Sequence, residues 1–172
     1  MTETSSSSVR LRSATQADCD TILGLIRGLA EYENLLDRVV ATPEKLTDTL
    51  FGAHPAAEVL LAEVDGQVQG FALFFHNYST FLAQRGLYLE DLFVRPEARG
   101  RGVGKALLKA LAELAVQRGC GRFEWSVLDW NQSAIDFYEA MGATVMPDWR
   151  ICRVTGEALT RLGGTPDSTR AC

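Results

Sequence analysis

The chain has 172 residues, enough for one domain with a substantial hydrophobic core. Hydrophobic residues make up 47% of it and charged residues 23%, as in ordinary soluble globular proteins. The net charge of -5 argues against nucleic acid as the main partner and suits a small cationic ligand. No apolar run could cross a membrane, and residues 1–8 lack the features of a signal peptide. We therefore expect a cytoplasmic protein that binds neither nucleic acids nor membranes.

Side chains suited to metal binding are few. The four cysteines are scattered without C-x-x-C spacing, and the only histidines are His54 and His76. This pattern predicts reduced thiols and no metal site.

The first part of the chain predicts one strand and two helices. Residues 1–8 include four successive serines and predict a disordered lead-in. Residues 9–12 alternate apolar and basic side chains, as a short strand does. Residues 15–33 begin with a capping-box pattern and continue with apolar residues at helical spacing. A threonine followed by proline starts a second helix over residues 42–52.

The middle of the chain predicts three strands. Residues 58–64 and 67–78 are strand-like, and Asp65-Gly66 between them is a hairpin signal. The second of these strands is apolar on both faces, which indicates a central position in the sheet. Residues 79–86 are expected to form a loop, and residues 87–94 a fourth strand.

The remaining elements follow a glycine-rich stretch. Residues 102–119 have the apolar spacing of a long helix. Residues 122–128 predict a fifth strand, residues 131–141 a short helix and residues 149–154 a last strand. A brief helix is expected around residues 157–162.

The element order is β-α-α-β-β-β-α-β-α-β, which indicates the α/β class with a mixed sheet covered by helices. No linker or internal repeat interrupts it. We expect a single domain over residues 9–162, followed by a polar tail over residues 163–172.

The glycine-rich stretch, residues 95–108, predicts a phosphate site. Glycines at alternate positions let the backbone pass close to a ligand, and the free N–H groups of the following helix favour an anion. The glycines and the cationic side chains that flank them are Gly100, Gly102, Gly104, Arg99, Arg101 and Lys105.

Two common phosphate-binding loops do not fit this stretch. A Walker P-loop needs glycine where Arg99 stands and serine or threonine where Ala106 stands. A dinucleotide-binding fingerprint that began at Gly100 would need glycine in place of Lys105. The loop therefore argues against an ATPase, a kinase and a dinucleotide-dependent enzyme.

Arg99-x-x-Gly102-x-Gly104 fits the R/Q-x-x-G-x-G/A pattern of the GNAT acetyltransferase superfamily. The chain also resembles the diamine acetyltransferase family, the spermidine/spermine and thialysine acetyltransferases, over residues 9–162. The segments that carry this resemblance are residues 12–33, 88–91, 99–104 and 127–132. It implies the GNAT fold with a mostly antiparallel central sheet, acetyl-coenzyme A as co-substrate, and a homodimer.

The resemblance also implies where acetyl-coenzyme A binds. Its pyrophosphate would lie on the loop amides, and its pantetheine arm would run beside the strand that precedes them. The implied cofactor-binding residues are Leu92, Phe93, Val94, Arg99, Gly100, Arg101, Gly102, Val103, Gly104, Lys105, Asn131 and Ser133. The three cations also fit as solvated surface charges, and Asn131 also fits as a helix cap.

Acetyl transfer to an amine requires the amine to lose a proton. An ammonium like that of lysine has a pKa of about 10.4, so freeing its lone pair at pH 7 costs about 4.6 kcal/mol. Glu90 interrupts an apolar strand and is the candidate base. A salt-bridge residue at a strand end is the alternative. Strand alternation predicts that Asp91 faces the opposite side.

Tyr138 is the candidate general acid. The departing coenzyme A thiolate needs a proton or a hydrogen bond, which a phenol can donate. The place of Tyr138 on the helix after Asn131 matches the general-acid tyrosine of the diamine acetyltransferases. A tyrosine that only packs in the core is the alternative.

Several acidic and polar residues would bind a cationic substrate. Tyr32 and Glu33 correspond to the amine-binding pair of the family. The substrate-binding candidates are Tyr32, Glu33, Glu90, Asp91, Glu124 and Ser126.

We therefore expect an N-acetyltransferase that acts on a primary amine of a thialysine-like amino acid or a polyamine. The amine would attack acetyl-coenzyme A directly in a ternary complex. The alternatives are a protein lysine or N-terminal acetyltransferase and a non-catalytic acyl-coenzyme A-binding module.

Overall fold

The computed structural model describes residues 9–164. The predicted lead-in and residues 165–172 of the predicted tail lie outside this range. Contacts divide the chain into two compact units, Met1–Ser126 and Val127–Cys172. No helix within residues 9–164 is long and apolar enough to span a membrane.

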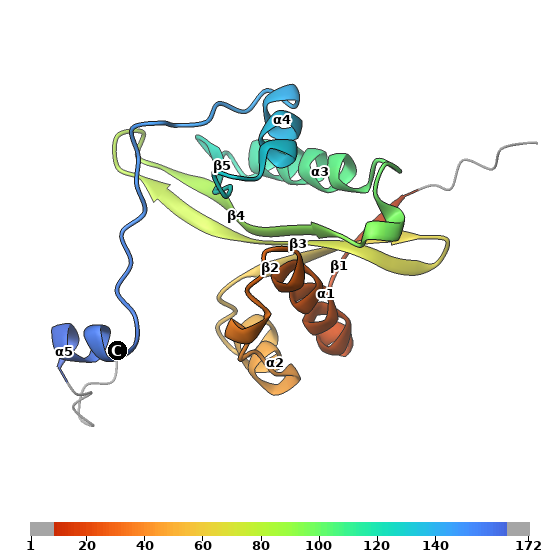
Figure 1. The fold of residues 1–172 in the computed structure, drawn as a ribbon. Coiled ribbons are helices and arrows are strands. Elements are labelled where there is room, and N and C mark those ends of the chain that lie inside the picture. Colours follow the sequence, from red (N-terminus) through yellow and green to blue (C-terminus); the bar gives the residue numbers. More distant parts are fainter. Residues whose placement is uncertain (1–8, 165–172) are drawn as a thin grey trace, which may run out of the picture. The chain divides into compact units, whose positions relative to one another are not determined.

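The first unit is built on a five-stranded sheet whose strands lie side by side in chain order (Figure 1). They are β1 (Arg10–Ser13), β2 (Glu58–Val64), β3 (Gln67–Ser79), β4 (Gln84–Val94) and β5 (Phe123–Trp125). Neighbouring strands are antiparallel except β4 and β5, which are parallel. The prediction of a mixed, mostly antiparallel sheet is confirmed.

Helices cover both faces of this sheet. They are α1 (Cys19–Tyr32), α2 (Pro43–Phe51) and α3 (Val103–Gln117). The first two lie on one face and α3 lies on the other (Figure 1). Ile22 and Leu25 of α1 and Phe71 of β3 are completely buried in one core cluster, and Leu107 and Leu111 of α3 are equally buried. Each such side chain stabilises the fold by about 1.5–3 kcal/mol, so the apolar spacing of the helices accounts for their packing.

Two predicted boundaries in this unit are wrong. The β3–β4 hairpin is longer than expected, because β4 begins at Gln84 and the predicted loop over residues 79–86 reduces to a tight turn. In contrast, β5 ends at Trp125, whereas the prediction extended it to residue 128. Strand ends depend on whether a neighbouring strand continues, which local composition does not report.

The second unit contains two helices, α4 (Gln132–Ala140) and α5 (Gly156–Gly163). The predicted helix at residues 131–141 is confirmed. Asn131 caps it by accepting a hydrogen bond from the backbone N of Ala134, and Gly142 ends it with a φ of 95°.

The prediction of a strand at residues 149–154 is wrong. This segment has no regular structure, and Trp149 and Ile151 are 78% and 70% exposed. The alternation of apolar and polar residues remains, but the described part of this unit holds no other strand to pair with it. An isolated strand leaves its backbone groups without partners and is not stable by itself.

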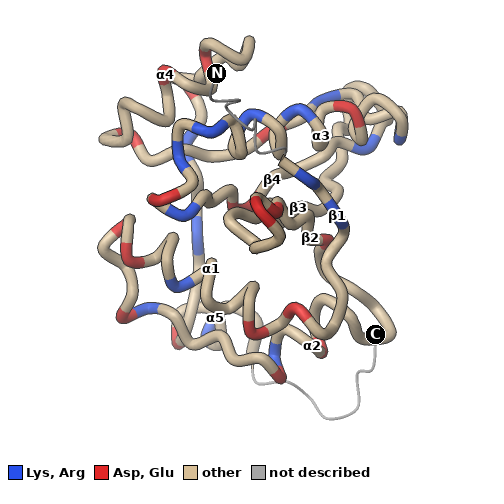
Figure 2. The backbone as a smooth tube through the Cα atoms, turned by 90° about the vertical axis from the view of Figure 1, so that its right-hand side faces the viewer, with Lys and Arg blue, Asp and Glu red and all other residues tan. Residues whose placement is uncertain are grey.

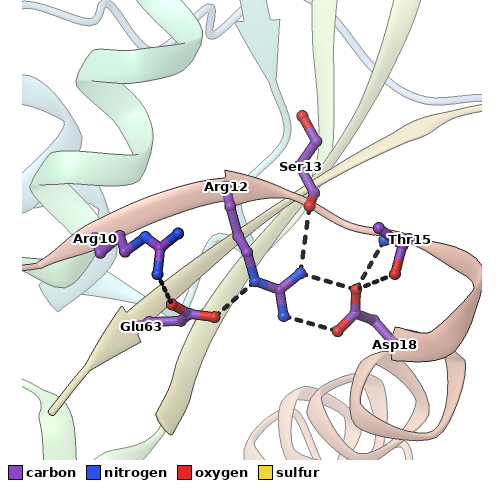
Figure 3. Close-up of polar contacts among 6 residues, drawn as sticks. All are labelled: Arg10, Arg12, Ser13, Thr15, Asp18 and Glu63. Carbon is purple, nitrogen blue, oxygen red and sulfur yellow. Dashed lines mark hydrogen bonds and ion pairs between the residues drawn. The ribbon is translucent and has the colours of Figure 1, made fainter. Parts of the chain in front are cut away.

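Arg12 on β1 joins the first strand to the start of the helical layer (Figure 3). Its Nε donates to Glu63 Oε1 of β2 at 2.6 Å, and its two Nη atoms donate to the Asp18 carboxylate at 2.8 Å each. The backbone N of Thr15 also donates to Asp18, which completes the predicted capping box. These contacts, chiefly the one from Arg12, hold the pKa of Asp18 well below its usual range.

We expect Asp18→Asn to lower the free energy of unfolding by about 2 kcal/mol at pH 7, because it removes charge-assisted hydrogen bonds. The pKa of Asp18 is lower in the folded state than in the unfolded state. This stabilisation is therefore present at pH values above the unfolded pKa and is lost as the pH falls. The difference between variant and wild type should therefore shrink as the pH falls below about 4. Urea unfolding across that range measures it. Asp20→Asn, at an exposed position in the same turn, is the control. A loss that does not depend on pH would contradict the ionic explanation.

Candidate functional site

A β-bulge lies in the middle of β4. Asp91 pairs with Leu73 of β3, whereas Leu89 pairs with the next residue, Phe74. Glu90 is therefore an extra residue without a partner on β3. Leu73 and Phe74 are consecutive and face opposite sides, so Leu89 and Asp91 also face opposite sides of the sheet, although they are two residues apart. The bulge places two successive carboxylates where the strand bends.

Beyond the bulge, one edge of β4 has no strand beside it among the described residues of the first unit. β5 pairs with β4 only from Leu87 to Leu89, although β4 continues to Val94. A bulge bends its strand and increases the local twist, which explains why β5 does not follow β4 further. The backbone of the predicted pantetheine-binding residues Leu92 and Phe93 thus presents polar groups that an extended ligand could pair with.

An acidic cluster forms where the C-terminal end of α1 meets β4. Glu33 follows the last residue of α1, and its negative charge acts on Asp91. Burial, then the charges of Glu90 and Glu33, raise the pKa of Asp91 to about 6. Burial also raises the pKa of Glu33. The structure thus brings together three of the predicted substrate-binding residues, and their mutual repulsion favours a bound cation.

The glycine loop follows β4 directly and ends in the first turn of α3. Gly100 and Gly102 have φ values of 74° and 80°, which glycine adopts without strain. The first amide that bonds within the helix is that of Ala106, to the Gly102 carbonyl at 2.9 Å. The N–H groups of Val103 and Gly104 therefore point out of the helix end and can bind an anion.

The three loop cations have different surroundings. Arg101 donates to Asp65 in the β2–β3 turn at 2.8 Å. Arg99 donates through Nε to the Val94 carbonyl at 3.1 Å and stacks on the ring of Tyr32. Lys105 is exposed. Figure 2 colours all lysine and arginine positions along the backbone blue and all aspartate and glutamate positions red. Two of the three cations are thus engaged within the protein.

The two site candidates near the end of β5 have protein partners. Glu124 is held by Arg122 Nε at 2.7 Å and by Asn77 Nδ2 at 3.0 Å. Ser126 Oγ lies 2.8 Å from the hydroxyl of Tyr88. Sequence reasoning did not identify Arg122, although its spacing of two residues from Glu124 places both on one face of a strand. Because Arg122 offsets its charge, Glu124 contributes less to an acidic site than the sequence implied.

The remaining candidates lie in the second unit. Tyr138 is partly buried on α4, and its ring centroid lies 5.4 Å from that of Phe137. Asn131 acts as the helix cap, and Ser133 Oγ donates to Asn131 Oδ1 at 3.2 Å. The capping role left open by the sequence is thus present, and it does not exclude a contact with a ligand.

Comparison with known proteins establishes the family. The model of the acetyltransferase (GNAT) family matches residues 26–143. The chain belongs to the GNAT acetyltransferase family. Thialysine N-epsilon-acetyltransferase from Sus scrofa is 42% identical to it over 168 residues, covering 91% of this chain and 98% of the relative. L-ornithine N5-acetyltransferase from Arabidopsis thaliana is 40% identical, covering 89% of this chain and 87% of the relative.

Solved structures support the same GNAT fold. An integron cassette protein from the mobile metagenome of V. cholerae has a TM-score of 0.77 and 28% identity to this chain. The match covers 92% of this chain and 99% of that one. The predicted family, fold class and chemistry are therefore confirmed: this GNAT protein is an N-acetyltransferase that uses acetyl-coenzyme A.

The residues present fit acetyl-coenzyme A. The free amides at the start of α3 suit a pyrophosphate, and the open edge of β4 suits an extended pantetheine arm. No group of three or more histidine, cysteine, aspartate or glutamate side chains within residues 9–164 could hold a metal ion.

Proposed function

We propose that this GNAT enzyme acetylates a primary amine of a small cationic substrate, a thialysine-like amino acid or a polyamine. The acidic cluster of Glu33, Glu90 and Asp91 carries the proposal. Glu90 and Asp91 lie on the strand that precedes the loop suited to the cofactor, and burial together with the charges of Glu90 and Glu33 raises the pKa of Asp91. The names of the relatives that act on thialysine and ornithine agree with this substrate class.

Acetyl-coenzyme A supplies the reactive thioester when bound. The loop amides from Arg99 to Lys105 would hold its pyrophosphate, and Lys105 would add a positive charge. Backbone groups of Leu92, Phe93 and Val94 would align its pantetheine arm. Asn131 and Ser133 are proposed as further contacts.

The acidic residues would have two roles toward the amine, binding the ammonium and accepting its proton. Glu33 and Asp91 would hold the ammonium, because binding a cation relieves their mutual repulsion. Glu90 is exposed at the bulge and would accept the proton, directly or through water. The free amine would then attack in a ternary complex. Tyr32, Glu124 and Ser126 would shape the substrate site.

Tyr138 would donate its phenolic proton, or a hydrogen bond, to the departing sulfur. A phenol with an ordinary pKa of about 10 is a weak acid suited to this role. Its position on α4 after the Asn131 cap supports the assignment.

We also propose that residues 9–162 act as one GNAT domain in a cytoplasmic homodimer. The family match spans the boundary between the two compact units, which supports the single domain. The dimer rests on the family resemblance, and light scattering tests it.

An amine panel tests the substrate proposal. We expect thiol release from acetyl-coenzyme A with at least one of thialysine, lysine, cadaverine, ornithine, spermidine, spermine and putrescine. Lysine with cadaverine, and ornithine with putrescine, are matched pairs that differ only in the carboxylate. They show whether the enzyme prefers an amino acid or a polyamine. Activity confined to a lysine peptide would favour the protein acetyltransferase alternative, and binding of acetyl-coenzyme A without any turnover would favour the non-catalytic module.

A further inference from the structure

Arg99, at the start of the glycine loop, reaches with its side chain to the C-terminal end of α1. The central carbon of its guanidinium is 4.9 Å from the ring centroid of Tyr32, the last residue of α1. The same carbon is 5.8 Å from the ring of Phe93 on β4. Both distances are within the range of cation–π attraction. Arg99 therefore contacts both α1 and the end of β4.

The close approach of α1 to β4 depends on a glycine. A Cβ at Gly28 would lie 2.9 Å from two ring atoms of Phe93, closer than real Cβ contacts. The missing side chain lets the Phe93 ring pack against the helix, one turn before Tyr32. Tyr32 and Arg99 are themselves exposed, but Arg99 also lies over the Phe93 ring that packs against α1.

The geometry leaves Arg99 with donors to spare. Its Nε is occupied by the Val94 carbonyl at 3.1 Å, and its face lies on Tyr32. The guanidinium also carries Nη donors, in the plane of the group and perpendicular to the stacking direction. Arg99 is therefore able to hold an anion at the loop and an aromatic ring at the same time.

Tyr32 connects this contact to the acidic cluster. Glu33 is the adjacent residue, and its charge acts on Asp91. Holding Tyr32 in place fixes the backbone that carries Glu33. A movement of the Arg99 side chain and a movement of the Glu33 carboxylate would thus both affect the C-terminal end of α1.

We propose that Arg99 is a positioning residue that couples the two substrates: a pyrophosphate bound at the loop restrains the exposed Arg99 side chain in the position seen here, where it holds Tyr32, and through it Glu33, in the arrangement that binds the amine. This role rests on the proposed function, since it requires a cationic amine at Glu33. Linkage requires the effect to be reciprocal, so the amine tightens cofactor binding by the same factor. A lysine cannot replace Arg99, because it lacks the planar face that stacks on the ring.

Calorimetry of thialysine binding with and without saturating coenzyme A tests the coupling, with spermidine as the probe if thialysine is not turned over. In the wild type we expect coenzyme A to lower the Kd of the amine about fivefold or more. Arg99→Lys and Tyr32→Leu should reduce this factor to less than about twofold, with thermal midpoints near that of the wild type. Tyr32→Phe, which keeps the ring, should retain it.

Arg27→Lys, at an exposed position on the same helix, is the matched control and should keep the wild-type factor. If Arg99→Lys no longer binds coenzyme A, Tyr32→Leu decides, because its side chain lies outside the loop. Full coupling in Tyr32→Leu, or none in the wild type, would overturn the role of Arg99 while leaving acetyl transfer in place. Absence of turnover with every small amine would instead refute the proposed function.

Discussion

Replacing Tyr138 with phenylalanine is expected to lower kcat about a hundredfold, which corresponds to about 2.7 kcal/mol in the activation barrier. The substitution keeps the ring on α4 and removes only the hydroxyl, so packing against Phe137 remains. If the hydroxyl protonates the departing sulfur, its interaction is made in the transition state and the affinity for coenzyme A should change less than twofold. Thiol release at saturating substrates measures kcat, and calorimetry measures the affinity.

Tyr78→Phe is the control for this variant, because Tyr78 is 60% exposed near the end of β3 and has no proposed role in the reaction. Its kcat should match that of the wild type. Unchanged turnover in Tyr138→Phe would rule out the general-acid assignment. A lower kcat accompanied by a lower thermal midpoint would instead indicate that the hydroxyl is needed for folding.

Asp91→Asn is expected to weaken amine binding and to stabilise the protein. Burial and the charges of Glu90 and Glu33 raise the pKa of Asp91 to about 6, from a usual value of 3.8. Because the folded-state pKa is the higher one, stability is fully present below the unfolded pKa and is lost as the pH rises through about 6. A shift of about 2 units corresponds to roughly 3 kcal/mol, so asparagine should recover up to that amount at pH 7.5.

The activity of Asp91→Asn should change in the opposite direction. Loss of a carboxylate that holds the ammonium should raise the KM of the amine about a hundredfold, while kcat changes less. In the wild type, the amine KM should rise as the pH falls through about 6, because Asp91 becomes protonated, and this step should be missing in the variant. Urea unfolding at pH 4 and 7.5, together with steady-state kinetics, measures both effects.

Two further variants help to interpret the result for Asp91→Asn, one as a control and one as a test of the base. Glu97→Gln, at an exposed position after β4, should leave stability and KM unchanged. Glu90→Gln separates proton transfer from binding: a base loses kcat, whereas a group that only binds the cation raises KM. A destabilised Asp91→Asn with normal KM would contradict the proposed role of the acidic cluster.

Most helices and strands were predictable because their signals are local. The Asp65-Gly66 turn, the Asn131 cap and the Gly142 stop depend on the residues at those positions, and the structure confirms them. The incorrect prediction of a strand at residues 149–154 shows the limit of local signals. Its alternation indicates a side-chain pattern, but a strand also needs a neighbour.

The candidate site shows the same division. The spacing of Arg99, Gly102 and Gly104 indicated the family, and Glu90 and Asp91 stood out as charges in an apolar strand. Neither observation could reveal the bulge, since a bulge is defined by the register of β4 against β3.

The sequence by itself determined the family, the loop suited to acetyl-coenzyme A and the identities of the acidic side chains, since these depend on residue type and short spacing. Only the tertiary structure decided that Glu33 and Asp91 interact, that Arg122 offsets Glu124, and that Arg99 stacks on Tyr32. The physical reason is that charge interaction and burial depend on distance in space. Helix α1 and strand β4 are far apart in the chain, and packing around Gly28 and Phe93 brings them together.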